Sequence, residues 1–323
     1  MDNPQIVATG PIDEPTATAL AEFGEIVITP DSQDATIRAH LGRAVALIVR
    51  GEAEITADII NEAQHVKVIS RSGVGYNNVD ITAATARGIP VVITPGAASK
   101  SMAEGAIAMM LTLSKQLIEW DAKLKSGDWQ CRFDANHRDL DGATLGIVGF
   151  GRIGQSLAHL AKAFGMHVVA YDPLIGDADA KAMGVSLMSL DDLMAQSDYI
   201  SIHAALTDDT QGLINKENLQ KVKRGAYLIN LARGGLIDSL DDVCEALQDG
   251  RLAGAGIDVF DHEPPEMSHP IFKQANCITT PHVIGISQGA IARIFRFMVE
   301  DTVAILRGDR PRPGHVVNPE VLS

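Results

Sequence analysis

Short apolar runs alternate with amphipathic stretches along almost the whole chain, which predicts strands followed by helices. The first third contains five runs typical of strands, at residues 5–9, 25–29, 46–50, 67–71 and 91–93. The segments between them with helical spacing are residues 16–23, 36–41, 57–63 and 81–87. A second series begins at residue 143, with six predicted strands at 144–149, 167–172, 199–203, 226–230, 255–259 and 277–280. This order predicts an α/β protein with two doubly wound parallel sheets.

The predicted domain boundary lies where the strand–helix alternation stops, near residues 94–96. A long apolar helix without proline is expected next, from about residue 102 to residue 124. A last helix over 289–306 is expected to return to the first domain, leaving 316–322 as a terminal strand or a tail. We therefore predict a discontinuous domain of residues 1–96 and 288–323 and a second domain of residues 97–287.

Composition and charge narrow the possible partners. The formal net charge of -14 disfavours nucleic acid and anionic membrane surfaces. The three cysteines are widely spaced, which predicts neither a disulfide framework nor a metal site. No apolar run approaches the length of a membrane span, and the first residues do not resemble a secretion signal, so a cytoplasmic protein is expected.

A glycine-rich segment, GFGRIG at residues 149–154, directly follows a predicted strand and opens a predicted helix. In a dinucleotide site Gly149 permits the tight turn, Gly151 lets a pyrophosphate approach the backbone, and Gly154 allows close helix–strand packing. Arg152 and Ile153 complete this segment at the helix amino terminus, which favours bound phosphate. The alternative is a tight turn without a ligand.

Asp172 ends the next predicted strand, about 20 residues beyond the glycines, where a carboxylate accepts hydrogen bonds from ribose hydroxyls. A 2′-phosphate would be repelled there, and no arginine directly follows, so the cofactor is predicted to be NAD rather than NADP. The alternative interpretation is that Asp172 only caps a loop.

Three polar segments follow later strands: NLARGG at 230–235, DVFDHEPP at 258–265 and TPHVIG at 280–285. With these motifs the sequence resembles the D-2-hydroxyacid dehydrogenase family, in its phosphoglycerate dehydrogenase-like branch. The resemblance runs from about Ala46 to the tail at 317–319 and includes SGVGYNNVD at 72–80. It implies a Rossmann cofactor domain, a flavodoxin-like substrate domain, and hydride transfer between NAD(H) and C2 of a small 2-hydroxy or 2-oxo acid.

The resemblance implies three catalytic residues whose chemistry suits that reaction. Arg233 would hold the substrate carboxylate and polarise its carbonyl with a planar fork of donors. His282 would transfer the proton, and Glu263 would orient the imidazole. Taken singly, such a histidine is usually a satisfied core or surface residue and such a glutamate is usually solvated, and only the combination favours catalysis.

The resemblance also implies a wider set of binding residues. Further cofactor contacts are expected from His203, Thr207, Ala232, Asp258, His282 and Gly285. The loop of Ser72, Gly73, Val74 and Gly75 would bind the substrate carboxylate through backbone N–H groups, unless it is a plain turn. Arg233 and His282 would also contact the substrate.

A second anionic group on the substrate is suggested by Arg50 and Arg71, which end two predicted strands. Either arginine can instead form only a surface salt bridge. The chain departs from the family pattern at Gly105, where histidine often follows the glutamate, at Ala205, where proline is usual, and at Ser287, where threonine is common. The first two departures lie near the expected nicotinamide pocket and leave its shape open.

Two other functions fit the same scaffold. One is an NAD-sensing corepressor-like protein that binds partner proteins, and the other is an NADPH-dependent glyoxylate or hydroxypyruvate reductase. A homodimer is expected through the long helix, because family members commonly dimerise there and this helix carries many apolar residues: Ile107, Met109, Met110, Leu111 and Leu113. The alternative is that this helix is fully buried within its own domain.

Overall fold

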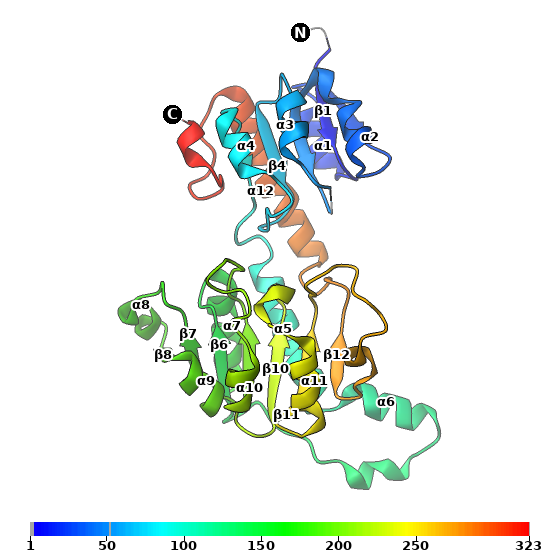
Figure 1. The fold of residues 1–323 in the computed structure, drawn as a ribbon, viewed down its shortest axis with the longest axis vertical. Helices are drawn as coiled ribbons and strands as arrows, with labels where there is room; N and C mark the ends of the chain where they lie inside the picture. The colour runs from blue at the N-terminus through cyan, green and yellow to red at the C-terminus, as the bar shows by residue number, and fades with distance from the viewer. Residues whose placement is uncertain (1–2, 52, 323) are drawn as a thin grey trace. The chain divides into compact units, whose positions relative to one another are not determined.

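The computed structural model describes residues 3–51 and 53–322. The chain divides into two compact units, which we call unit 1 (Met1–Ala98 with Ser287–Ser323) and unit 2 (Ser99–Ile286) (Figure 1). Both units contain a parallel sheet, so the prediction of an α/β protein with two doubly wound parallel sheets is confirmed. Within the described ranges, no helix has both the length and the apolarity of a membrane span.

Unit 1 is built on a five-stranded parallel sheet in the order β2-β1-β3-β4-β5, which is the flavodoxin-like order. Its strands are β1 (Gln5–Ala8), β2 (Glu25–Ile28), β3 (Ala44–Val49), β4 (Val68–Arg71) and β5 (Val91–Val92). Its helices are α1 (Glu14–Leu20), α2 (Asp34–Arg38), α3 (Ala57–Glu62), α4 (Ile81–Ala86) and α12 (Gln288–Arg307), with 3-10 turns at Leu41–Arg43 and Pro319–Leu322.

The alternation of β3 explains how helices cover both faces of this sheet. Leu47 and Val49 belong to the apolar core shared with α2, α3 and α4, whereas Ile48 belongs to the core shared with α1 and α12. Helix α12 returns to unit 1 through buried Phe295 and Met298. The period-two pattern therefore positions helices on both sides of the sheet.

Unit 2 is built on a seven-stranded parallel sheet in the order β12-β11-β10-β9-β6-β7-β8. Its strands are β6 (Thr144–Val148), β7 (His167–Tyr171), β8 (Ser186–Leu187), β9 (Tyr199–Ile202), β10 (Ala226–Asn230), β11 (Leu252–Ile257) and β12 (Cys277–Thr279). Its helices are α5 (Ser99–Ser114), α6 (Leu117–Lys125), α7 (Arg152–Ala163), α8 (Asp177–Ala182), α9 (Leu190–Gln196), α10 (Lys216–Gln220) and α11 (Leu240–Gln248), with 3-10 turns at Gln130–Asp134, Gly234–Leu236 and Pro270–Lys273. From β8 to β11 this is the Rossmann order, and the strand order reverses between β6 and β9.

Two details differ from the predicted elements. The single helix expected over 102–124 is wrong: α5 ends at Ser114, Gln116 adopts a left-handed conformation with φ 51°, and α6 begins at Leu117. Nothing in the local sequence marks this break, because neither proline nor glycine occurs there. The very short β8 adds a seventh strand that the pattern missed. The end of the chain, predicted as a terminal strand or a tail, forms a β-bridge from Val316 to Val92 followed by a 3-10 turn.

Candidate active site

The glycine-rich turn between β6 and α7 is shaped by close backbone approaches. Gly149 has a φ of 94°, and a Cβ on it would lie 2.4 Å from the backbone nitrogen of Ala204. A Cβ on Gly154 would lie 2.4 Å from the carbonyl oxygen of Gly149, whereas a Cβ on Gly151 would meet nothing within 4 Å. The first and third glycines therefore serve packing, and the second leaves the backbone open to a ligand.

The amino terminus of α7 offers free backbone donors at this open position. Gly151 is the N-cap residue and provides no side-chain hydrogen bond to the first turn. Because the first N–H groups of a helix lack partners within it and carry partial positive charge, they suit a pyrophosphate. Arg152 is exposed and Ile153 half-buried. These residues therefore fit the phosphates of a dinucleotide.

Asp172 follows β7 and supports the turn directly. Its Oδ2 accepts a hydrogen bond from the backbone N–H of Phe150 at 2.8 Å, and its Oδ1 accepts one from Leu174 at 2.9 Å. A carboxylate has about four acceptor positions, so roughly two remain for hydroxyl donors. Asp172 thus caps the loop and still has capacity for a ribose.

His203, at the end of β9, contributes a buried polar atom beside the glycine turn. Its Nε2 lies 2.8 Å from Oγ of Ser201, while its Nδ1 is buried and has no hydrogen-bond partner among the described residues. Burial lowers the pKa of His203 from 6.5 to about 4, so the ring is neutral near pH 7. Thr207, farther along, is exposed and its backbone N–H donates to Oγ1 of Thr210. The unpartnered Nδ1 fits a polar group of a bound cofactor.

Arg233 is held on a short loop after β10 by a buried asparagine. The side chain of Asn230 donates to the carbonyl oxygen of Arg233 at 2.9 Å and accepts from the N–H of Ala232 at 3.1 Å. Nη1 of Arg233 donates to the carbonyl oxygen of Ala232 at 2.7 Å. Burial lowers the pKa of Arg233, and the charge of Glu263 acts in the opposite direction. An arginine stays cationic in such surroundings, so this loop presents a fixed positive charge.

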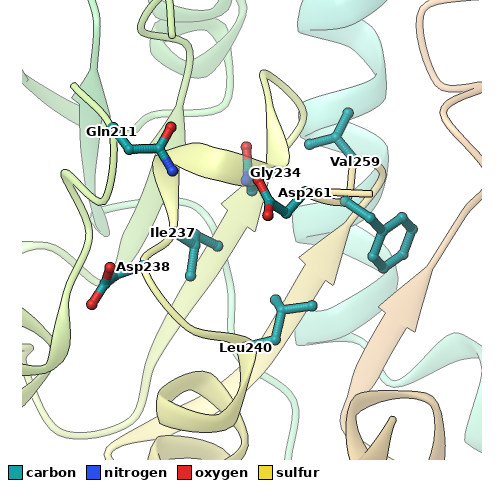
Figure 2. Close-up of a pocket in the computed structure, with 9 residues that line it drawn as sticks. Gln211, Gly234, Ile237, Asp238, Leu240, Val259 and Asp261 are labelled. Carbon is teal, nitrogen blue, oxygen red and sulfur yellow. The ribbon is translucent and has the colours of Figure 1, made fainter. Parts of the chain in front are cut away.

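Gly234 lets the arginine loop lie directly on the chain that leads to Glu263. A Cβ on Gly234 would lie only 2.0 Å from the carbonyl carbon of Phe260, so a side chain has no room there. Figure 2 shows Gly234 and Asp261 beside each other in a small pocket of about 80 Å³ that Gln211 also lines. The close approach of Gly234 to Phe260 fixes the Arg233 loop relative to the loop that leads to Glu263.

Glu263 and His282 form a hydrogen-bonded pair. Nδ1 of His282 lies 2.7 Å from Oε2 of Glu263, and Oε1 of the same carboxylate accepts the N–H of Phe260 at 3.0 Å. An ionised carboxylate only accepts, so Nδ1 carries the hydrogen and Nε2 is left for another partner. The pair has the geometry of an oriented acid–base residue.

The turn that carries His282 is organised by Asp258, which is fully buried after β11. Its carboxylate accepts hydrogen bonds from Oγ1 of Thr280 at 2.6 Å and from the N–H groups of Val283 at 2.9 Å and Ile284 at 3.2 Å. The N–H of His282 donates to the carbonyl oxygen of Asp258 at 2.8 Å, and His282 adopts a φ of 51°. Asp258 therefore fixes the turn that carries the imidazole, and a direct cofactor contact from Asp258 stays a prediction.

Two residues that build this site, Asn230 and Thr280, have no individual role among the sequence predictions. Asn230 is the last residue of β10 and Thr280 directly follows β12, and a polar residue at the carboxyl end of a strand was the available signal. Gly285, which was expected to contact the cofactor, lies on the same turn as His282, and Met102 packs against it. Unit 2 thus brings Arg233, Glu263 and His282 together on neighbouring, mutually braced loops.

The other expected substrate residues lie in unit 1, at the carboxyl ends of β3 and β4. The backbone N–H groups of Ser72 and Gly73 already donate to Val49 and Arg71, respectively. Within this loop, only the N–H groups of Val74 and Gly75 donate to no other described residue, so the expected anion-binding loop has two available backbone donors instead of four.

The two arginines of unit 1 have structural contacts of their own. Nη1 of Arg50 donates to the carbonyl oxygen of Pro11, and its guanidinium lies 4.7 Å from the centre of the Phe295 ring. Burial lowers the pKa of Arg50. Nη1 of Arg71 donates to the carbonyl oxygen of Ser72. Both side chains are thus held at the sheet edge that also carries the loop 72–75.

Comparison with known proteins identifies the class. Residues 107–283 match the model of the D-isomer specific 2-hydroxyacid dehydrogenase, NAD binding domain, and the chain belongs to this family. The predicted family and the predicted cofactor, NAD, are confirmed.

Individual relatives differ in name. The chain is 38% identical over 326 aligned residues to D-3-phosphoglycerate dehydrogenase of Mycobacterium leprae, covering 99% of this chain and 61% of the relative. It is 36% identical over 293 residues to hydroxypyruvate reductase of Thermotoga maritima, covering 90% and 94%. Its fold matches the crystal structure of D-lactate dehydrogenase from Aquifex aeolicus with NAD and lactic acid, with a TM-score of 0.87, 29% identity and coverage of 97% and 99%. The chain spans about three fifths of the length of the phosphoglycerate dehydrogenases it matches.

Proposed function

We propose that this protein is an NAD-dependent dehydrogenase that moves a hydride between the nicotinamide and C2 of a small 2-hydroxy or 2-oxo acid. The observation that carries the proposal is the hydrogen-bonded pair of Glu263 and His282, on loops braced against the Arg233 loop in the NAD-binding unit. Reduction of a 2-oxo acid needs a fixed cation, a proton donor and a hydride donor, and NADH supplies the hydride.

The roles of the three residues follow from their positions. Arg233 binds the carboxylate and the carbonyl oxygen of the substrate through its planar fork of donors. As the hydride reaches C2, the carbonyl oxygen gains negative charge, and Nε2 of His282 gives it a proton. Glu263 keeps the imidazole in the tautomer that presents Nε2, and it stabilises the ring while the ring is cationic. In oxidation each transfer runs in reverse.

The cofactor contacts are proposed residue by residue. Gly151, with the amides of Arg152 and Ile153, would receive the pyrophosphate, and Asp172 would accept from the adenosine ribose. Gly149 and Gly154 would hold the turn. The nicotinamide half of NAD would be surrounded by five further residues: His203, Thr207, Ala232, Asp258 and Gly285.

A substrate with a second anionic group is favoured by the two arginines at the carboxyl ends of β3 and β4. We propose that the free N–H groups of Val74 and Gly75 bind the substrate carboxylate and that Arg50 and Arg71 bind an anionic group on C3. Similarity to relatives named D-3-phosphoglycerate dehydrogenase supports a phosphate there. Replacing each arginine with alanine should raise KM for a phosphorylated 2-oxo acid more than KM for pyruvate.

The direct experiment is NADH consumption with a panel of 2-oxo acids: pyruvate, glyoxylate, hydroxypyruvate and its 3-phosphate. Turnover of at least one acid, with loss of turnover in Arg233→Ala and His282→Ala, is expected. Tight NADH binding without turnover of any acid would refute the proposal that the protein is a dehydrogenase and would favour an NAD sensor. A higher kcat/KM with NADPH than with NADH would show that Asp172 does not select the cofactor.

Exposed apolar side chains are concentrated on α6 and the residues that follow it, and not on α5. The apolar residues of α5 that were expected to form a dimer interface lie mainly inside unit 2, with Met109 and Met110 at 4% and 0% exposure. Helix α6, by contrast, buries no residue and extends from the sheet of unit 2 (Figure 1). Its exposed apolar residues, with those that follow, are Leu117, Ile118, Leu124, Trp129 and Phe133.

We propose that a second copy of the chain covers this surface of α6, since such a row of exposed apolar side chains is unusual on a monomer. Light scattering after gel filtration is expected to give the mass of a dimer for the wild type. The double variant Leu117→Asp with Ile118→Asp is expected to run as a monomer. A monomeric wild type would refute the proposal.

A further inference from the structure

Gly105 lies in the interior of α5, where glycine is less favourable than alanine because of its greater backbone freedom. Its surroundings explain why no side chain is present. A Cβ built on Gly105 would lie 2.0 Å from Cγ2 of Ile284, which fills the space beside the helix. The contact is specific to that methyl group, because Cβ of Ile284 is 3.4 Å away and its carbonyl oxygen 3.6 Å away.

Ile284 belongs to the turn that carries His282. One side of this turn is held by the carboxylate of Asp258, which accepts the N–H groups of Val283 and Ile284. The other side is held by the Ile284 side chain, which packs against the apolar core of unit 2 and against Gly105. Ile284 is therefore held from both sides of the turn, and His282 lies only two residues before it in the chain.

We propose that Gly105 is a positioning residue: the missing side chain lets Ile284 pack against α5, and this packing sets where His282 presents Nε2. The inference rests on the proposed role of His282 in proton transfer. It also gives a physical meaning to the departure at Gly105, because any larger residue there would have to displace Ile284.

An added methyl group at position 105 would clash with Ile284, and the Ile284 side chain cannot easily move away. Isoleucine is branched at Cβ and stiff at χ1, so rotation removes Cγ2 from the helix only by giving up packing against the core. The neighbouring contact differs, because a Cβ on Gly285 would meet the sulfur of Met102, the flexible end of a long side chain. The turn, and with it the imidazole, is therefore expected to move in Gly105→Ala.

The test is a double-variant cycle of wild type, Gly105→Ala, Ile284→Ala and the double variant, measured with NADH and the best 2-oxo acid of the panel. Gly105→Ala is expected to lower kcat about 100-fold, the loss that a displacement of about 1 Å from productive geometry can cause. KM is expected to change far less. In Ile284→Ala the clashing methyl group is absent, so the double variant should stay within threefold of Ile284→Ala. Gly42→Ala is the matched control, because a Cβ there meets nothing within 4 Å.

Two results would overturn the inference: a kcat for Gly105→Ala within threefold of wild type, or a double variant as slow as Gly105→Ala. If Gly105→Ala fails to fold, the comparison of the double variant with Ile284→Ala decides by the same threefold criterion.

A second readout is independent of turnover. The ring ¹H–¹⁵N signals of His282, assigned by their loss in His282→Asn, should shift in Gly105→Ala and return in the double variant. Unchanged signals would refute the inference. If the wild type reduces no 2-oxo acid, the proposed function fails, and these signals still decide whether Gly105 positions the imidazole.

Discussion

Glu263→Gln isolates the charge of the carboxylate at nearly constant shape. Oε1 of Glu263 accepts the N–H of Phe260, so the glutamine oxygen is expected to take that place. The new amide NH₂ then faces Nδ1 of His282, where a carboxylate oxygen lay at 2.7 Å. An amide hydrogen directed at Nδ1 makes this nitrogen an acceptor and moves the ring hydrogen to Nε2 without positive charge, which leaves a much weaker acid.

The size of the effect follows from the exposure of the pair. A hydrogen bond to a charged group contributes about 1.5–3 kcal/mol. Because the side chains of His282 and Glu263 are 48% and 35% exposed, solvent screening favours the lower end, about 2 kcal/mol. At 1.36 kcal/mol for each factor of ten this is about 30-fold. The weaker acid adds to that loss, so kcat is expected to fall between about 30-fold and about 1,000-fold.

The assay is steady-state NADH oxidation at saturating 2-oxo acid, together with NADH affinity from fluorescence. NADH affinity should change little, because the carboxylate stabilises a ring that becomes charged during the reaction. Glu266→Gln is the matched control, since this glutamate is exposed and its side chain accepts, among the described residues, only from Oγ of Ser268. A kcat for Glu263→Gln within twofold of wild type would refute the assigned role of the pair.

Three further predictions concern the cofactor turn. Gly149→Ala should raise the NADH Kd at least tenfold and lower Tm by several degrees, because φ is 94° and the added Cβ would lie 2.4 Å from backbone; calorimetry that shows both values unchanged would contradict this. Desolvation gives the partly buried His203 a folded-state pKa of about 4 against 6.5 when unfolded. Its contribution to stability, up to about 3 kcal/mol, is therefore present above pH 6.5 and is lost as the pH falls toward 4. Urea unfolding at pH 7 and 4.5 should therefore show a smaller pH difference in His203→Gln than in wild type, and an equal difference would exclude the effect. Asp172→Ala should reduce the preference for NADH over NADPH at least tenfold in kcat/KM, and an unaltered ratio would remove Asp172 from cofactor selection.

Much of the fold could be predicted because its signals are local. Strand β10 alternates between the two apolar cores, with Tyr227 and Ile229 in one and Leu228 in the other, and such alternation is visible in the sequence. The glycine turn after β6 is also a local pattern. The break between α5 and α6 had no such signal, because the left-handed residue there is Gln116 and not a glycine, which would have marked a positive φ in the sequence.

The candidate site was predictable as a set of residues but not as an arrangement. The family motifs named Arg233, Glu263 and His282, whereas their mutual bracing depends on residues far apart in the chain. Asp258 meets Thr280 across 22 positions, and Gly105 meets Ile284 across a much longer separation. Contacts of this kind form only when the sheet brings loop ends together, so periodicity along the sequence does not reveal them.

The central claim is hydride transfer to C2, and isotope transfer tests it most directly. The protein is incubated with NADH deuterated at C4 of the nicotinamide, using both C4 epimers in turn, and with each 2-oxo acid of the panel. Mass spectrometry and NMR of the products are expected to show one deuterium at C2 of a 2-hydroxy acid with one of the two epimers. Bound NADH and no deuterated product from any acid would contradict the account.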